Sequence, residues 1–186
     1  GETGLMALDW NNGNRTILTD VRLSGMILGQ TLHTEAHEIY RALIEATAFG
    51  ALTIIKRMEE YGVTIDEVVN TGGLAVKNTV LMQIYADILA RPLKVAASDQ
   101  TCALGAAIFA AASSGEMTIA EVQDNCCQNR EVVYKPIPEN QKIYEELYLL
   151  YRQLHDGFGT EGWSGSMENV MKDLIKIRER QRNSEA

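Results

Sequence analysis

The sequence predicts an α/β domain with a small parallel sheet, followed by a helical tail. Helical and strand-like segments alternate between residues 34 and 113, and this order is typical of a parallel sheet covered by helices. The strands are short and few, so we expect a sheet that is incomplete at its N-terminal edge. From residue 157 the chain becomes rich in Gly and Ser and then in charged residues. We therefore expect one domain over residues 1–157 and a linker with a charged tail helix over residues 158–186.

The first 34 residues show poor periodicity and are expected to form extended chain with short turns. The first helix is expected to begin at an N-cap on Thr34, with Glu38 in the first turn, where the helix dipole favours a carboxylate. Apolar residues then recur at helical spacing to about Arg57. Tyr61-Gly62 is a typical helix end.

The next elements follow from apolar runs and from the residues that interrupt them. In order, we expect a strand at 68–71, a helix at 80–89, a strand at 93–96, a helix at 101–113 capped by Ser98-Asp99, a helix at 118–125, and a long amphipathic helix after 136–138. Thr118 and Glu121 form a capping-box pattern. The tail helix is expected over about 168–182, with a thin apolar stripe that has no obvious core to join.

Composition excludes several classes of function. The chain of 186 residues is 46% hydrophobic and carries a net charge of −8, so it has no basic excess for binding nucleic acid. No apolar run approaches the roughly 20 residues that span a bilayer, and no secretory signal is recognisable. The three cysteines lack the spacing of a disulfide framework or a zinc site. We expect reduced thiols, a cytoplasmic location and no membrane partner.

The most informative local feature is Gly72-Gly73, placed between a strand and a helix that Asn78 can open. Without Cβ atoms, two adjacent glycines let backbone N–H groups approach a phosphate closely. An ordinary strand-to-helix turn has the same local sequence, and Asn78 is also a good N-cap. The local pattern therefore leaves both a nucleotide site and a plain turn open.

A second glycine of interest, Gly105, lies within an apolar helix, where glycine costs roughly 1 kcal/mol relative to alanine. It is expected to allow close approach of the helix to a sheet or to a nucleotide, and we favour packing against the sheet. His33 and His37 are four residues apart, but no third ligand is near, so we expect no metal site. Asp9 and Asp20 are expected to be solvated carboxylates.

Four stretches of this sequence resemble the carboxyl-terminal half of the FGGY family of carbohydrate kinases. They are Leu8–Thr16; Gly25–Gly29 with Glu38 and Glu45–Gly50; Gly72-Gly73 with Asn78, Gln83, Ala86 and Asp87; and Gln100–Ala107. Together they span about residues 4–157. The resemblance implies a ribonuclease-H-like domain of the actin-like ATPase type.

The resemblance also implies a role for the glycine turn. In this family a Gly-Gly turn belongs to the adenosine motif, so Gly72 and Gly73 are expected to lie against the phosphates or ribose of ATP. Asn78 is expected to face the sugar or base of the nucleotide. The family places a polar residue four or five positions after the second glycine, so Lys77 is a competing candidate.

Other parts of the family pattern are not recognisable here, among them the catalytic aspartate and two phosphate-binding turns. We therefore expect no catalytic residue in this chain and a missing amino-terminal kinase domain as its partner. By resemblance, the whole enzyme transfers the γ-phosphoryl group of ATP, bound with Mg²⁺, to a ketopentose, and L-ribulose is the expected sugar. A xylulose or glycerol kinase, a non-catalytic module with an ATPase-like fold, and a homo-oligomer stay open.

Overall fold

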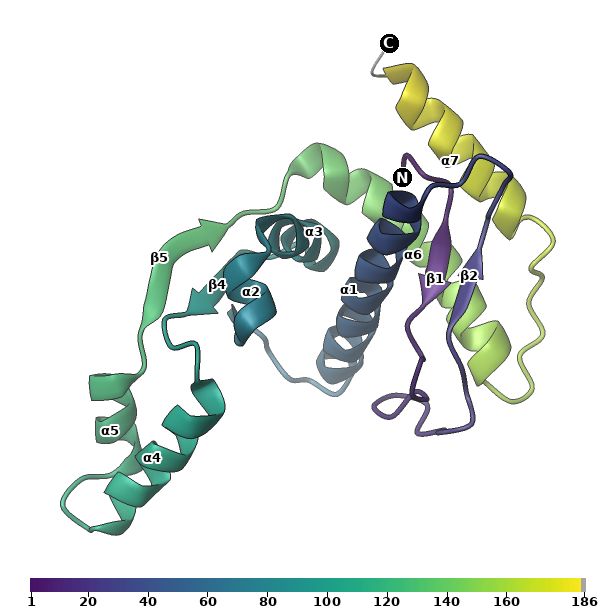
Figure 1. Cartoon of the computed structure of the whole chain (residues 1–186). Coiled ribbons are helices and arrows are strands. Elements are labelled where there is room, and N and C mark those ends of the chain that lie inside the picture. The colour runs from purple at the N-terminus through teal and green to yellow at the C-terminus, as the bar shows by residue number, and fades with distance from the viewer. Residues whose placement is uncertain (185–186) are drawn as a thin grey trace. The chain divides into compact units, whose positions relative to one another are not determined.

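The computed structural model describes residues 1–184, which form two compact units (Figure 1). Unit 1 contains residues 1–65 and 87–90 and the chain from Pro136 onward; unit 2 contains residues 66–86 and 91–135. Unit 1 consists of β1 (Met6–Leu8), β2 (Met26–Leu28), α1 (Ala36–Glu60), α6 (Pro138–Gly159) and α7 (Val170–Ser184). Unit 2 consists of β3 (Val68–Asn70), α2 (Gly73–Lys77), α3 (Thr79–Leu89, whose end from Asp87 belongs to unit 1), β4 (Leu93–Ala96), α4 (Thr101–Ser113), α5 (Ile119–Cys126) and β5 (Asn129–Tyr134).

The sheets are less regular than the sequence suggests. The pairing of β3 with β4 is parallel, as expected, but β5 joins β4 in the antiparallel sense, so the sheet of unit 2 is mixed. The prediction missed β5 because most of its side chains are exposed and give no alternation of buried and polar residues. The extended chain expected before residue 34 includes β1 and β2, and their pairing in an antiparallel ladder was not predicted.

Helix α1 begins one residue later than predicted. The Thr34 hydroxyl accepts a hydrogen bond from the N–H of Thr31 at 2.8 Å, so it is engaged in the preceding turn. Glu35 is the N-cap, and its N–H donates to the carboxylate of Glu38 at 2.9 Å in a capping box. At the other end, Gly62 adopts a φ of +80°, which confirms the predicted helix end.

The core of unit 1 is an aromatic cluster between α1 and α6. The rings of Phe49 and Tyr151 lie 5.2 Å apart, and those of Phe49 and Tyr144 lie 6.1 Å apart at an edge-on angle. Glu45 is buried nearby, and its carboxylate accepts hydrogen bonds from the Tyr144 hydroxyl at 2.9 Å and from Nε of Arg41 at 3.0 Å. The buried carboxylate is therefore satisfied, and β1 contacts both helices beside this cluster.

The C-terminal part of the chain is more ordered than its composition predicts. Helix α6 continues to Gly159, so the first two residues of the expected linker are helical. The apolar stripe of α7 is buried, and α7 contacts α6. The members of that stripe are Val170, Leu174 and Ile177. The boundary between residues 157 and 158 as a domain limit stays a prediction.

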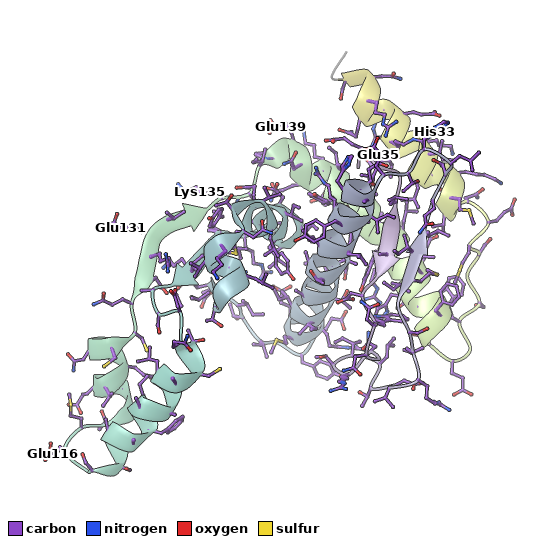
Figure 2. All side chains as sticks on the ribbon, in the orientation of Figure 1. His33, Glu35, Glu116, Glu131, Lys135 and Glu139 are labelled. Carbon is purple, nitrogen blue, oxygen red and sulfur yellow. The ribbon has the colours of Figure 1, made fainter. Side chains whose placement is uncertain are left out.

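Helix α4 has an unusual surface. Gln100 precedes it as N-cap, in place of the predicted Ser98 or Asp99. The helix contains no charged residue, yet among its side chains Ile108 alone is buried, and Phe109 is 65% exposed. Figure 2 shows Glu116 in the turn that leads from α4 to α5. A helix that is apolar on all sides is normally covered, so the exposure of α4 is atypical.

Two predictions about ionisable groups have different outcomes. Burial raises the pKa of Asp9, which is half-buried, so describing it as a solvated carboxylate was wrong. The pKa of Asp20 is lowered, chiefly by a hydrogen bond from the Arg22 side chain. Residues 1–184 contain no group of three or more His, Cys, Asp or Glu residues placed to hold a metal ion. Glu35 is the N-cap of α1, and His33 lies in the turn before it (Figure 2).

The first prediction concerns Gly29, directly after β2. Its φ is +92°, and a Cβ there would lie 2.2 Å from the carbonyl oxygen of Gly4. Gly62 has a similar φ of +80° but open space around it. Gly29→Ala should lower the free energy of unfolding by about 1–3 kcal/mol more than the control Gly62→Ala, the usual cost of overpacking. Denaturant unfolding measures both; equal losses would contradict the close approach.

The second prediction concerns pH. Burial lowers the pKa of His155 from 6.5. Between the pKa of the folded chain and pH 6.5, the unfolded chain therefore binds a proton at this residue that the folded chain does not. The contribution of His155 to stability is therefore complete above about pH 6.5 and decreases as the pH falls from there toward the folded-state pKa. Unfolding curves of wild type and His155→Gln between pH 7 and pH 5 should show a shallower pH dependence in the variant. An equal pH dependence in wild type and variant would contradict the effect of burial on His155.

Candidate functional site

The glycine turn in unit 2 has an open backbone. Strand β3 ends at Asn70, Gly72 takes a φ of +90°, and α2 begins at Gly73. A Cβ built on either glycine would have no atom within 4 Å. Positive φ explains why Gly72 is glycine. Internal packing explains neither glycine, so both leave main chain accessible to a ligand.

Asn78 connects α2 to α3. Its N–H donates to the Leu74 carbonyl at 3.0 Å, and its side-chain oxygen accepts from the N–H of Leu81 at 2.9 Å. The expected capping role is therefore confirmed. The Asn78 side-chain amide nitrogen has no partner within residues 1–184. Lys77 is exposed at the end of α2. The turn thus presents both candidates, and their contact with a nucleotide stays a prediction.

A cavity of about 420 Å³ opens in unit 2 beside this turn. Val69 and Thr71 border it at the end of β3, and Ala96 and Ser98 border it after β4. Because β3 and β4 are parallel, their carboxyl ends meet at one edge, where ligands of open α/β sheets bind. The other walls come from α4 and from the junction between α5 and β5; their members are Thr101, Leu104, Gly105, Ile108, Gln123, Cys127, Gln128 and Asn129.

The lining contains no Asp, Glu, Lys, Arg or His. Aliphatic side chains from α4 are combined with amide side chains at Gln123, Gln128 and Asn129. Such a surface suits an uncharged, partly apolar group with a few hydrogen-bonding positions, such as a nucleobase with its ribose. Phosphates would instead need the bare N–H groups of the adjacent turn.

Gly105 does not have the role in packing against the sheet that we favoured from the sequence. A Cβ at this position would have no atom within 4 Å, so the glycine does not serve packing against the sheet. It lies in the cavity wall on α4. The other alternative, close approach of the helix to a nucleotide, stays a prediction.

None of the four predicted residues Gly72, Gly73, Lys77 and Asn78 lines the cavity; Thr71, one residue earlier, does. Sequence reasoning missed the amide side chains after α5 because it missed β5, which fixes their place. In the sequence, Gly105 within an apolar helix was the one feature that pointed to α4 as a wall of the cavity. The three cysteines are free and exposed, and Cys127 borders the cavity.

The chemistry of the lining sets limits on a cofactor. An uncharged cavity next to two open glycines can hold the nucleoside part of ATP, with the phosphates at the turn. The described residues offer no cluster of three or more His, Cys, Asp or Glu side chains for a metal ion, and the binding of Mg²⁺ through the nucleotide stays a prediction. Within residues 1–184, no helix has both the length and the apolar character required to cross a bilayer.

Comparisons with known proteins agree on the family. Residues 2–114 match the FGGY family of carbohydrate kinases, C-terminal domain. The chain is 51% identical over 184 residues to a ribulokinase from Geobacillus thermodenitrificans and 49% identical over 180 residues to one from Mycolicibacterium smegmatis. Each alignment covers 96% of this chain and 32% of the relative, so the chain spans about a third of the curated relatives it matches.

Solved structures show the same fold. A xylulose kinase from Lactobacillus acidophilus aligns with a TM-score of 0.74 at 23% identity, over 87% of this chain and 32% of that one. A xylulose kinase from Rhodospirillum rubrum aligns with a TM-score of 0.69 at 28% identity, over 85% and 32%. A glycerol kinase from Plasmodium falciparum with ADP aligns with a TM-score of 0.67 at 21% identity, over 85% and 31%.

The third prediction separates the two roles of Asn78. Asn78→Ala removes the acceptor for the Leu81 N–H and should lower the free energy of unfolding by about 1 kcal/mol. Asn78→Asp keeps an acceptor and should retain most of that stability. If the amide nitrogen also contacts the nucleotide, both variants should weaken ATP binding, measured by calorimetry. Normal ATP affinity in Asn78→Asp would limit Asn78 to capping.

Proposed function

The chain belongs to the FGGY family of carbohydrate kinases, and we propose that it forms the nucleotide-binding part of an ATP-dependent L-ribulose kinase. The observation that carries the proposal is the 51% identity to a ribulokinase over almost the whole chain. The reaction of the whole enzyme would convert L-ribulose to L-ribulose 5-phosphate, in L-arabinose catabolism. The open glycine turn beside an uncharged cavity supports a nucleotide as the ligand of this part.

In this proposal, each part of unit 2 has a separate task. The main chain at Gly72 and Gly73 lies against the phosphates or ribose of ATP, where side chains would prevent the approach. The cavity beside Thr71 and Gly105 takes the base. Either Lys77 or Asn78 contacts the nucleotide, and the free amide nitrogen of Asn78 favours the latter.

Phosphoryl transfer depends on positioning and charge neutralisation, and Mg²⁺ supplies part of that neutralisation when bound with ATP. We assign no catalytic residue to this chain. The catalytic base and most of the sugar site would come from an amino-terminal kinase domain, since the chain spans about a third of its relatives. Without that partner, the chain should not phosphorylate any sugar. The free, exposed thiols are compatible with the cytoplasmic location that we propose.

The choice of sugar rests on sequence identity and not on the fold. Structural similarity extends to xylulose and glycerol kinases, so the fold alone does not select a substrate. The intact enzyme should be assayed with L-ribulose, xylulose and glycerol as phosphate acceptors. The highest kcat/KM with L-ribulose is the expected result. Preference for another sugar would reassign the substrate, and absence of turnover with every acceptor would favour a non-catalytic module.

The fourth prediction tests the glycine turn in the intact enzyme. Gly73 has open space around it and no positive φ, so Gly73→Val should be tolerated by the fold. The new side chain should block approach of the nucleotide and raise the KM for ATP far more than the KM for the sugar. Gly115→Val, at a positive-φ glycine that borders a different cavity, is the control for general strain. A selective rise in the KM for the sugar would contradict this assignment.

A further inference from the structure

Strand β5 is the outer strand of the sheet in unit 2. The strands pair in the order β3, β4, β5, so among the described residues one edge of β5 faces no other strand. Its residues from Asn129 to Val133 are exposed, and Tyr134 is half-buried. An outer strand of this kind presents backbone N–H and C=O groups that can pair with a strand from another chain.

The C-terminal half of β5 is the regular part of this edge. The register of β5 against β4 is continuous at Val133 and Tyr134 and shifts between Val133 and Asn129. At the end of the strand, the Lys135 carbonyl accepts a hydrogen bond from the side chain of Gln83 in α3 at 2.8 Å. The stretch that is open to pairing therefore ends at Lys135.

The side chains of this stretch complement each other when a second β5 runs antiparallel to the first, with Val133 opposite Val133. Glu131 would then lie opposite Lys135 of the second copy. Val132, which is 57% exposed, would lie opposite Tyr134 of that copy. A two-fold axis produces each of these pairs twice. Opposite charges, and a β-branched residue beside an aromatic ring, are cross-strand pairs that stabilise a sheet.

Other registers of the same two strands are less favourable. A shift by one residue sets Arg130 opposite Lys135 of the second copy, and like charges in that position repel. A register with Arg130 opposite Glu131 lies where the pairing of β5 with β4 is irregular. Arg130 is also already paired with Asp99 at 2.8 Å. Charge complementarity therefore favours the register with Val133 at the centre.

The two charged residues of that register are available. Glu131 and Lys135, both labelled in Figure 2, are exposed. Neither side chain forms an ion pair or a hydrogen bond within residues 1–184. A second copy of β5 would supply a partner of opposite charge to each of them.

We propose that β5 pairs with β5 of a second copy of this chain, antiparallel and with Val133 at the two-fold axis. The sheet of unit 2 would then continue across two copies. Because two short strands bury little surface, the dimer is weak and reversible. The inference stands on unit 2 alone and does not depend on the proposed kinase activity.

Sedimentation equilibrium of the 186-residue chain, from about 10 µM to about 1 mM, tests the proposal. We expect a reversible equilibrium between monomer and dimer, with slower amide hydrogen exchange in β5 at the higher concentrations. A monomer at every concentration would overturn the proposal. A dimer whose β5 amides exchange as fast as those of the monomer would overturn it as well.

Charge reversal tests the register. Glu131→Lys and Lys135→Glu each replace two attractive pairs with two repulsive ones, and each should weaken dimerisation about tenfold. The double variant restores both pairs with exchanged charges, keeps the net charge of −8, and should dimerise as the wild type does. Glu116→Lys makes the same charge change outside β5 and should leave dimerisation unchanged. Single variants that dimerise normally, or a double variant as weak as the single ones, would contradict the pairing.

Discussion

The parallel pairing of β3 with β4 is the constraint on which the candidate nucleotide site depends. Val68 is opposite Leu93 and Asn70 is opposite Val95, so both strands end at the same edge of the sheet. The chain leaves that edge twice, once through the glycine turn and once toward α4. A shift of the register by one residue would turn the side chains at this edge to the other face. Hydrogen bonds between two short strands therefore determine where the wall at the glycine turn lies relative to the wall after β4.

Sequence patterns predicted the elements that have a strong local signal. The capping box at Thr118 and Glu121 is present, and α3 and β4 lie where the apolar runs placed them. Helical periodicity and cap chemistry are encoded within a few residues, so one sequence suffices to recognise them. Strand β5 could not be recognised in this way, because its polar, exposed residues acquire their conformation from pairing with β4.

The site was predicted in part for the same reason. Gly72 and Gly73 are visible in the sequence because two adjacent glycines after a strand are a local signal. The amide side chains at Gln123, Gln128 and Asn129 reach the cavity only through tertiary structure. The burial of Asp9 is also a tertiary effect, which no pattern of neighbouring residues indicates. Local chemistry thus identified the turn, and the fold supplied the walls.

Glycine serves two opposite purposes in this chain. Around Gly73 and Gly105 it leaves space, whereas around Gly159 and Gly165 other side chains take the volume of the missing Cβ atoms. The second use has a practical consequence for engineering. Loop tips normally tolerate tags and inserted domains, but an insertion between residues 160 and 165 would displace Trp163 from its glycine partner. A fusion is better placed beyond Ser184, after the last helix of the described chain.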